Sequence, residues 1–413
     1  MRILVVGSGG REHALAWKLS QEAEVLCAPG NPGMAERAHC FEIPTSDFQG
    51  IADLAVTQSV DLVVVGPEAP LIDGLADALR ARGLSVFGPG LEGARLEGSK
   101  AFSKRLMMEA GVPTAGSEVF EDPALAHEYV RSRPGKVVVK ASGAALGKGV
   151  LVTDSEEEAH EAVDAMLVER EFGDAGATIV IEDRLEGREF SLLTLCSDAG
   201  IYSLPVAQDY KRALDNDRGP NTGGMGSFSP VSWISRDLVE ETEDRVVRPI
   251  LQALRNRATP YRGVLFSGLM MHEGKVNCLE FNVRFGDPET QSVVRRLGLG
   301  LAGALKACAD GQSIPPPSVE ENAVVTVVAA SGGYPGEYEK GKEISIGAMP
   351  EGVQVFHAGT ALRDGRLVTG GGRVLAVSAA AQNIEAARRL AYEGVARIGF
   401  EGMRFRADIA AEP

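Results

Sequence analysis

The chain has 413 residues, of which 44% are hydrophobic and 24% are charged, and its formal net charge is −15. This length exceeds one ordinary core and predicts about two to four domains, while no apolar run approaches the roughly 20 residues of a membrane helix. The acidic balance argues against nucleic-acid binding, and the five scattered cysteines argue against a disulfide framework or a zinc site. We expect a soluble cytoplasmic protein that binds neither nucleic acid nor membranes.

The first hundred residues alternate apolar, strand-like runs with amphipathic stretches. "RILVV", "EVLCA", "DLVVVG" and "LSVFG" are typical of buried strands, and "EHALAWKLS", "FQGIADLAV" and "LIDGLADALRARG" lie between them. This alternation predicts a Rossmann-like, doubly wound parallel sheet over residues 1–100. A helix should follow, with Ser99 as its N-cap, Lys104 within it and Gly111 just past its end.

The glycine loop "VVGSGGREH" follows the first predicted strand and opens the first predicted helix. Backbone N–H groups and the helix dipole favour an anion at such a place. Glu12 occupies the position of the third glycine of a dinucleotide fingerprint, so NAD binding is only weakly supported. A structural turn and a sugar-phosphate site both remain open.

A second glycine loop lies in "VVVKASGAALGKGVLVTD", where Lys140 closes one strand and Lys148 precedes the next. It lacks the glycine spacing, the Ser or Thr after the lysine and the following helix of a Walker A loop. We interpret it as a β-turn-β flap that folds backbone amides over a triphosphate, with the lysines as cationic contacts. A solvated hairpin with incidental lysines is the alternative.

Two further segments have the character of small-molecule contacts. "TIVIEDRLEGREFSLL" holds two strand-like runs around a break, and such a connector can bind adenine and ribose through Glu182, Leu185 and Glu189. An acidic surface turn is the alternative there. Residues 212–229, "RALDNDRGPNTGGMGSFS", have no helical or strand period and are interpreted as a substrate loop, with disorder as the alternative.

The stretch "CLEFNVRFGDPETQ", residues 278–291, alternates with a period of two. The apolar members, which would face the core, are Leu279, Phe281, Val283 and Phe285. The polar residues between them would then lie on the opposite face of the strand. Glu280 and Asn282 can then present oxygen ligands to one or two Mg²⁺ ions on ATP phosphates. Arg284 would reach the transferring phosphoryl group. The alternative is a polar strand face packed against loops.

The order of these segments is similar to that of a known family. It resembles the phosphoribosylamine–glycine ligases, or glycinamide ribonucleotide synthetases, of the ATP-grasp superfamily, through "GSGGREHAL", "VVGPEAPL", "LEGSKAFSK", the lysine-glycine flap, "QDYKR", "GPNTGGMG", "EFNVRFGDPETQ", "GGYPG", "FHAGT" and "GGRVLAV". The resemblance covers nearly the whole chain, and "RFGDPETQ" is highly specific.

The resemblance implies an α/β ATP-grasp fold, preceded by a doubly wound parallel-sheet domain and followed by a small β-rich domain. The expected boundaries are 1–100 for the N-terminal domain, 101–120 and 188–320 for the ATP-grasp core, 121–187 for its lid and 321–413 for the C-terminal domain. They place the proline-rich connector "SIPPPSVEEN" between the core and the last domain.

The resemblance further implies an ATP-dependent carboxylate–amine ligase of de novo purine synthesis, which joins glycine to 5-phosphoribosylamine. The glycine carboxylate would attack the γ-phosphate of ATP, and the amine would displace phosphate from the resulting glycyl phosphate to give glycinamide ribonucleotide. Catalysis would depend on positioning, charge neutralisation and exclusion of water. Mg²⁺ or Mn²⁺ is the expected metal, and the oligomeric state stays open, with a monomer as one option.

Matched position by position, the resemblance makes Glu280 and Asn282 the metal ligands, and Arg284 keeps its catalytic role. The nucleotide would be bound by Lys104, Lys140, Gly147, Lys148, Glu182, Leu185 and Glu189. The substrates would be bound by Gly9, Gly10, Arg11, Asp209, Lys211, Asn221, Gly224, Asp287 and Arg373.

The sequence departs from the family pattern at Ser142, Ala144 and Ala145, at Tyr210, where histidine is frequent, and at its end, where relatives often continue with Gly-x-Arg. We expect these changes to affect flap dynamics or affinity more than the reaction. Two alternatives remain: a different ATP-grasp carboxylate–amine ligase, and a catalytically silent nucleotide-binding protein. A panel of amino acids and amines would detect the first, and the retained metal ligands and lysines argue against the second.

Overall fold

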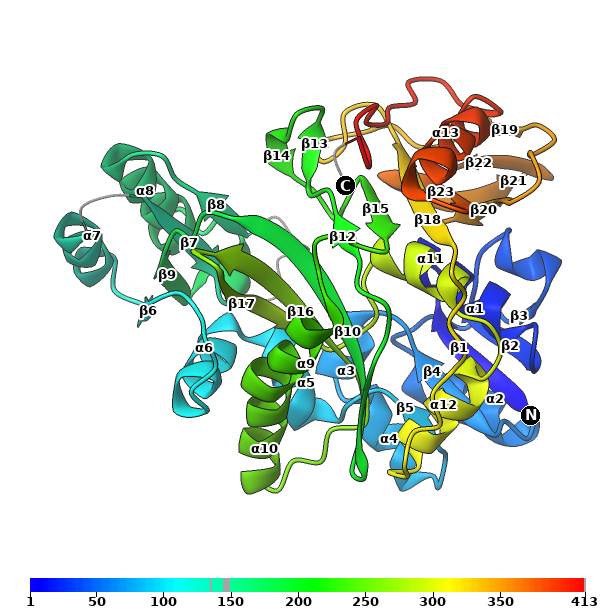
Figure 1. Cartoon of the computed structure of the whole chain (residues 1–413), viewed down its shortest axis with the longest axis horizontal. Helices are drawn as coiled ribbons and strands as arrows, with labels where there is room; N and C mark the ends of the chain where they lie inside the picture. The colour runs from blue at the N-terminus through cyan, green and yellow to red at the C-terminus, as the bar shows by residue number, and fades with distance from the viewer. Residues whose placement is uncertain (134–135, 144–148, 412–413) are drawn as a thin grey trace.

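The computed structural model describes residues 1–133, 136–143 and 149–411. The chain begins with a five-stranded parallel sheet in the order β3-β2-β1-β4-β5, drawn in blue in Figure 1. The central strand β1 pairs with β2 on one side and with β4 on the other, so the winding direction reverses there. The predicted doubly wound sheet is therefore confirmed.

Helices connect these strands in the order that the sequence predicts. The strands are β1 (Arg2–Gly7), β2 (Glu24–Pro29), β3 (His39–Cys40), β4 (Leu62–Val65) and β5 (Val86–Phe87). The helices are α1 (Gly10–Leu19), α2 (Phe48–Thr57), α3 (Glu68–Ile72), α4 (Leu75–Ala81) and α5 (Leu91–Gly98). The predicted helix α6 (Lys100–Glu109) follows, and the Ser99 hydroxyl caps it by accepting the N–H of Phe102.

A four-stranded sheet in the order β6-β9-β7-β8 lies toward the left-hand end of the molecule in Figure 1. Its strands and helices are β6 (Ser117–Phe120), α7 (Pro123–Ser132), β7 (Val137–Ala141), β8 (Val150–Val152), α8 (Glu156–Val163) and β9 (Ile179–Asp183). The two strands predicted on either side of the second glycine loop are present as β7 and β8, which pair antiparallel. Gly147, Lys148, Ala144 and Ala145 lie outside the described residues.

A second antiparallel sheet has the order β11-β10-β16-β17. Its strands are β10 (Arg188–Ser197), β11 (Gly200–Ser203), β16 (Gly263–His272) and β17 (Lys275–Asn282). The same part of the chain also forms the helices α9 (Arg236–Thr242), α10 (Arg248–Asn256), α11 (Glu289–Val293) and α12 (Leu301–Ala309). Among the helices of the described ranges, none is long and apolar enough to cross a bilayer.

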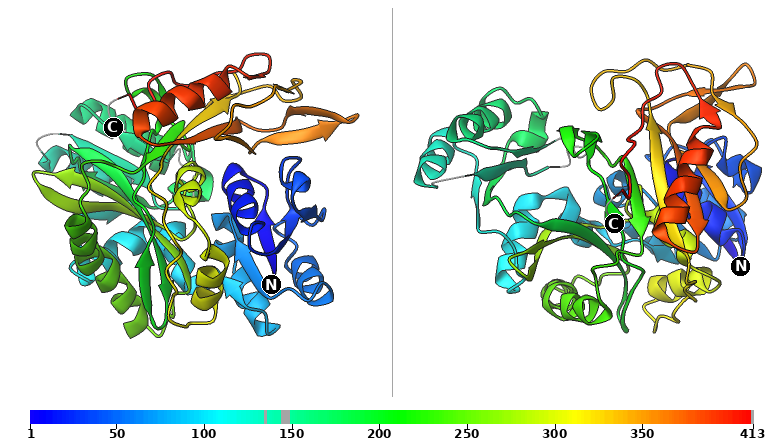
Figure 2. Two further views of the ribbon diagram at one scale, coloured as in Figure 1. Left: turned by 45° about the vertical axis from the view of Figure 1, so that its right-hand side comes forward. Right: turned by 45° about the horizontal axis from the view of Figure 1, so that its top comes forward.

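The fourth large sheet joins two distant parts of the chain in the order β12-β15-β18-β23-β20. Strand β12 (Gln208–Asp209) pairs with β15 (Gly226–Ser229), β15 pairs with β18 (Ala323–Ala330), β18 pairs with β23 (Arg373–Ala381), and β23 pairs with β20 (Val353–His357). Figure 2 shows helix α13 (Ile384–Val395) lying over this sheet. Three short pairs complete the fold: β13 (Arg212–Leu214) with β14 (Arg218–Asn221), β21 (Thr360–Arg363) with β22 (Arg366–Thr369), and β19 (Ser345–Ile346) with β24 (Ile398–Gly399).

The interpretation of residues 212–229 as a stretch without regular structure is wrong. They contain the hairpin β13–β14 and the strand β15, which pairs with β18 about a hundred residues later. Glycine and asparagine are poor strand formers, so the local pattern does not reveal strands that distant pairing partners stabilise. The segment is thus an ordered part of the fold.

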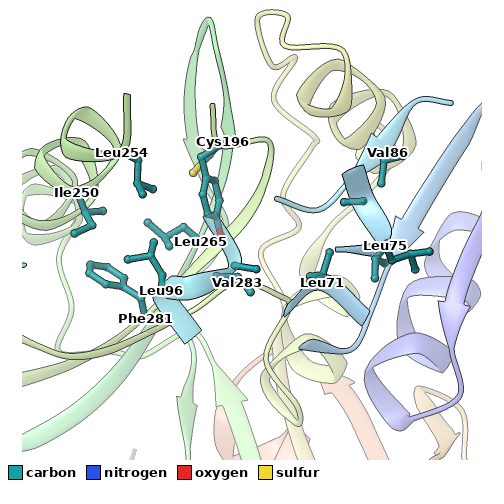
Figure 3. Packing of buried hydrophobic residues seen from close by; sticks show 14 of the residues in the cluster. Leu71, Leu75, Val86, Leu96, Cys196, Ile250, Leu254, Leu265, Phe281 and Val283 are labelled. Carbon is teal, nitrogen blue, oxygen red and sulfur yellow. The ribbon is translucent and has the colours of Figure 1, made fainter. Parts of the chain in front are cut away.

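Strand β17 contains a bulge that corrects one prediction about the core. Gly268 pairs with Glu280 and Leu269 with Cys278, which leaves Leu279 without a partner. The extra residue shifts the alternation, so Cys278 is fully buried and Leu279, predicted to face the core, is only half-buried. After the bulge the prediction holds: Phe281 and Val283 lie in one apolar cluster with Leu96, Leu265, Ile250 and Leu254 (Figure 3).

Candidate active site

Three charged residues of the candidate site lie close together where the carboxyl ends of β1 and β4 face the end of β17. Arg11 follows β1, Glu68 follows β4, and Arg284 follows β17. Nε of Arg284 lies 3.3 Å from Oε2 of Glu68, and Nη1 of Arg11 donates to the carbonyl oxygen of Phe285 at 3.1 Å. The carboxyl ends of parallel strands are the usual ligand-binding edge of such a sheet, so the fold places these residues where a site is expected.

Glu280 and Asn282 lie side by side at the end of β17, on the face opposite to the core. The Glu280 carboxylate has no ion pair within 4 Å among the described residues. Burial raises the pKa of Glu280, but the cations Lys211, Lys140 and Lys100 lower it further, so the pKa falls below its ordinary value. Asn282 Oδ1 lies 3.5 Å from Nη2 of Arg284. The carboxylate is therefore ionised and held among cations without a direct partner.

This pair of oxygen donors fits a hard divalent cation. A carboxylate and an amide oxygen are typical Mg²⁺ donors, and Mg²⁺ commonly takes only one or two carboxylates while substrate phosphates and waters complete its shell. Within residues 1–133, 136–143 and 149–411, no group of three or more His, Cys, Asp or Glu side chains converges as a metal site. The protein would thus supply only part of a metal's coordination, as expected for a nucleotide-bound ion.

Two predicted nucleotide lysines share a single buried carboxylate. Nζ of Lys104 lies 2.5 Å from Oε2 of Glu182, and Nζ of Lys140 forms an ion pair with Oε1 of the same side chain. Lys104 also donates to Oγ1 of Thr114 at 2.6 Å. Despite burial, the lysines lower the pKa of Glu182, so it is ionised. Two ammonium groups against one carboxylate leave positive charge for a phosphate.

The structure adds Lys100, which the sequence interpretation missed. Its backbone N–H donates to the carbonyl oxygen of Ser142 at 2.8 Å, and the Ser142 hydroxyl accepts the N–H of Ala101 at 3.1 Å, so α6 begins against β7. Burial lowers the pKa of Lys100 below its ordinary value, although the neighbouring Glu280 carboxylate acts in the opposite direction. A lysine in the first helical position opposes the helix dipole, which is the signal that could have identified it.

Lys211, Asp209 and Glu189 come together although the prediction divided them between substrate and nucleotide. Nζ of Lys211 forms an ion pair with Glu189 and lies 3.7 Å from Oδ1 of Asp209. Burial lowers the pKa of Lys211, but these carboxylates raise it well above its ordinary value. Burial raises the pKa of Asp209. The Lys211 ammonium group is thus held between Glu189, which was predicted to bind the nucleotide, and Asp209, which was predicted to bind the substrates.

Three predicted substrate segments converge on Asp287. Its Oδ1 lies 3.3 Å from Nη1 of Arg373, and its Oδ2 accepts the N–H of Arg11 at 3.3 Å. Arg373 also donates to the carbonyl oxygen of Gly223 at 2.6 Å. Gly224 adopts a φ of +111°, and a Cβ there would lie 2.4 Å from Cδ of Pro288, so only glycine permits this approach.

The remaining predicted residues have more ordinary surroundings. The N–H of Gly9 donates to Glu12 at 2.6 Å, and a Cβ on Gly10 would lie 2.7 Å from Nε2 of Gln291. The first turn of α1 is therefore occupied by the protein's own side chains. Leu185 lies half-buried between β9 and β10, and Asn221 ends β14. Tyr210, a departure from the family pattern, accepts the N–H of Ala410 through its hydroxyl at 2.9 Å.

Three family profiles together match almost the whole chain. Residues 1–97 match the N domain of phosphoribosylglycinamide synthetase, residues 98–290 its ATP-grasp (A) domain, and residues 324–412 its C domain. The chain belongs to the phosphoribosylglycinamide synthetase family. The predicted family and the predicted ATP-grasp fold with flanking parallel-sheet and C-terminal domains are thereby confirmed.

Relatives within the synthetase family are similar over the full chain. Phosphoribosylamine–glycine ligase of Nostoc sp. is 45% identical over 99% of both proteins. The human trifunctional purine biosynthetic protein adenosine-3 is 44% identical over 99% of this chain, which spans only 41% of that longer protein. The crystal structure of phosphoribosylamine–glycine ligase from Thermotoga maritima has a TM-score of 0.87 and 38% identity, and it covers 99% of this chain and 100% of that one.

A more distant solved structure shares the fold alone. The biotin carboxylase domain of a Hydrogenobacter thermophilus 2-oxoglutarate carboxylase, solved with MgADP and bicarbonate, has a TM-score of 0.74 at 17% identity. It covers 98% of this chain and 91% of that one.

Proposed function

We propose that the protein is an ATP-dependent ligase that joins glycine to 5-phosphoribosylamine in purine biosynthesis and forms glycinamide ribonucleotide, ADP and phosphate. The observation that carries this proposal is the ionised Glu280 carboxylate, which lies beside Asn282 and near three lysines and forms no ion pair with any residue that the structure describes. Such a group suits a nucleotide phosphate with its divalent cation. The full-length similarity to phosphoribosylamine–glycine ligases supports the same reaction.

Two adjacent groups of residues bind the two phosphate-bearing substrates, ATP and the amino-sugar phosphate. Lys100 and Lys140 lie beside Glu280 and neutralise the nucleotide phosphates. Asp287 and Arg373 contact each other beside the glycine-rich segment around Gly224, where they hold the amino-sugar phosphate. Arginine guanidinium groups are well matched to phosphate, and the Asp287 carboxylate accepts hydrogen bonds from hydroxyl or amine groups.

The reaction then needs orientation more than a side-chain nucleophile. The glycine carboxylate attacks the γ-phosphate, ADP leaves, and the amine of the sugar phosphate displaces phosphate from glycyl phosphate. Arg284 stabilises the charge on the transferring phosphoryl group. Glu280 and Asn282 would hold a divalent cation, Mg²⁺ or Mn²⁺, which would supply further charge neutralisation at the phosphates. Closure against water matters because an acyl phosphate is otherwise hydrolysed.

ADP release measured with a coupled assay tests this proposal. Release should require glycine and freshly prepared phosphoribosylamine together, and mass spectrometry should detect glycinamide ribonucleotide. Omission of either substrate, or replacement of glycine by alanine, serves as the control. Release that occurs with another amino acid and amine, but not with this pair, would identify a different ATP-grasp ligase.

We also propose a cytoplasmic location. The five cysteines are all free thiols, and four of them are buried, which agrees with a reducing compartment. Fractionation of cells that express the tagged protein tests this location.

A further inference from the structure

Glu97, in the last turn of α5, binds two consecutive residues that directly follow the proposed metal strand. Its Oε2 accepts the backbone N–H of Val283 at 2.8 Å. Its Oε1 lies 2.9 Å from Nη2 of Arg284, and the side chain is only 10% exposed. One carboxylate therefore fixes both the backbone and the guanidinium just after Asn282.

This is an unfavourable place for a carboxylate on local grounds. An acidic side chain near a helix C-terminus opposes the helix dipole, and burial raises the pKa of Glu97. Leu96, the preceding residue, is 1% exposed in the apolar cluster of Figure 3, so α5 cannot turn to release Glu97 to solvent. What offsets these costs is the contact with Arg284 and the N–H of Val283.

The guanidinium of Arg284 is held from several sides. Nη1 donates to the carbonyl oxygen of Phe285 at 3.3 Å, Nη2 lies 3.5 Å from Oδ1 of Asn282, and Nε lies 3.3 Å from Oε2 of Glu68. Burial lowers the pKa of Arg284, but Glu97 and Glu68 raise it above its ordinary value. Among these partners, Glu97 makes the shortest contact with the guanidinium.

We propose that Glu97 is a positioning residue, which orients the Arg284 guanidinium beside Glu280 and Asn282 for stabilisation of the transferring phosphoryl group. This inference rests on the proposed function, because it assumes that Arg284 acts on that group. Rigid orientation is valuable here since a small misplacement of a charged group costs a large part of its catalytic effect. Glu97 acts through Arg284 and touches no substrate.

The substitution Glu97→Gln tests the proposal with little change in shape. The amide oxygen can still accept the N–H of Val283, but the anion that orients the guanidinium is lost. We expect kcat to fall by roughly tenfold or more and the KM for ATP to change by less than about threefold, because the lost interaction orients a group that acts mainly in the transition state. A changed KM with unchanged kcat would overturn the proposal.

Glu92→Gln is a matched control on the same helix. Glu92 is 58% exposed on its side chain and pairs with Arg95 at 2.9 Å, so the same loss of charge occurs at the surface. Its kcat should remain close to wild type. If Glu97→Gln does not fold, Glu97→Asp replaces it. Asp keeps the charge but is one methylene shorter, so Glu97→Asp should retain part of the wild-type turnover.

A double-mutant cycle with Arg284→Lys separates positioning from general structural damage. If Glu97 acts through Arg284, the combined variant should lose little more turnover than Arg284→Lys alone. Losses in kcat that multiply in the combined variant would overturn the proposal. A wild type that releases ADP without forming glycinamide ribonucleotide would refute the proposed function alone, and the cycle would then be scored on ADP release. A wild type that releases no ADP would overturn both.

Discussion

Nζ of Lys104 lies 2.5 Å from Oε2 of Glu182, although the two side chains are only 4% and 3% exposed. The other carboxylate oxygen of Glu182 pairs with Lys140. A single buried anion thus compensates two buried cations. Removal of one partner of a buried ion pair is costly because the remaining charge is left without compensation.

Glu182→Gln should therefore lower the free energy of unfolding by roughly 3–5 kcal/mol. Urea unfolding followed by circular dichroism measures this loss. Asp183→Asn is the control, since Asp183 pairs with Arg133 at 3.1 Å with side chains 45% and 39% exposed, and should cost no more than about 1 kcal/mol. Equal losses in the two variants would contradict the buried cluster.

Glu280→Gln should reduce turnover by roughly a hundredfold or more at limiting Mg²⁺ while the thermal unfolding midpoint stays close to wild type. The variant keeps the size of the side chain but removes the negative charge among the three lysines. Titration of Mg²⁺ in the ADP-release assay measures the effect. Glu273→Gln, in the exposed turn between β16 and β17, is the control. Activity near wild type in Glu280→Gln would show that Glu280 is not a metal ligand.

Arg284→Lys should lower kcat by roughly 10- to 1,000-fold and weaken ATP binding much less. Lysine keeps the charge but loses the planar fork that contacts two phosphoryl oxygens together. Steady-state kinetics and a calorimetric titration with an ATP analogue separate the two effects. Arg248→Lys, with 56% of its side chain exposed, is the control. Weakened ATP binding with unchanged kcat would make Arg284 a binding residue.

His13 should make stability depend on pH at the contact between α1 and β20. Its Nδ1 accepts the N–H of His357 at 2.8 Å, and burial lowers the pKa of His13 to about 3. The unfolded chain binds a proton below the ordinary value of 6.5 while the folded chain does not. Stability from this group is therefore complete above pH 6.5 and lost as pH falls toward 3.

His13→Asn keeps an acceptor and removes this titration. Relative to the variant, the wild type should lose roughly 3–5 kcal/mol of unfolding free energy between neutral pH and about pH 3. Urea unfolding at several pH values measures the difference. His39→Asn, at an exposed histidine, controls for the loss of an imidazole. Parallel stability curves for wild type and His13→Asn would contradict a neutral, buried His13.

Local signals predicted much of this fold. The N-cap Ser99 and the apolar period located α6, and the alternation of strands and helices located the parallel sheet, because these features depend on neighbours in the sequence. The bulge at Leu279 was not predictable in this way, since it arises from the register with β16. The pairing of β15 with β18 likewise depends on distant partners.

The candidate site was likewise predictable only in part. Glu280, Asn282 and Lys140 were predicted from residue type and spacing, Lys211 came only from the family resemblance, and Lys100 was missed; the structure brings the three lysines into the electrostatic environment of Glu280. The anchoring of Arg284 was missed because Glu97 precedes Val283 by 186 positions and belongs to a helix with an ordinary amphipathic pattern. No periodicity in sequence indicates which carboxylate a buried arginine will contact.

The sheet β12-β15-β18-β23-β20 limits how this protein can be dissected. Strand β15 comes from the middle of the chain, and its backbone pairs with β18 from Ser229 opposite Val324 to Gly226 opposite Val327. A truncated protein that stops before residue 323 would leave this strand as an open edge, which favours intermolecular pairing and aggregation. The C-terminal part would in turn lose its partner strand. Chimaeras between related proteins should therefore exchange residues 208–229 together with the C-terminal part, as one inseparable unit.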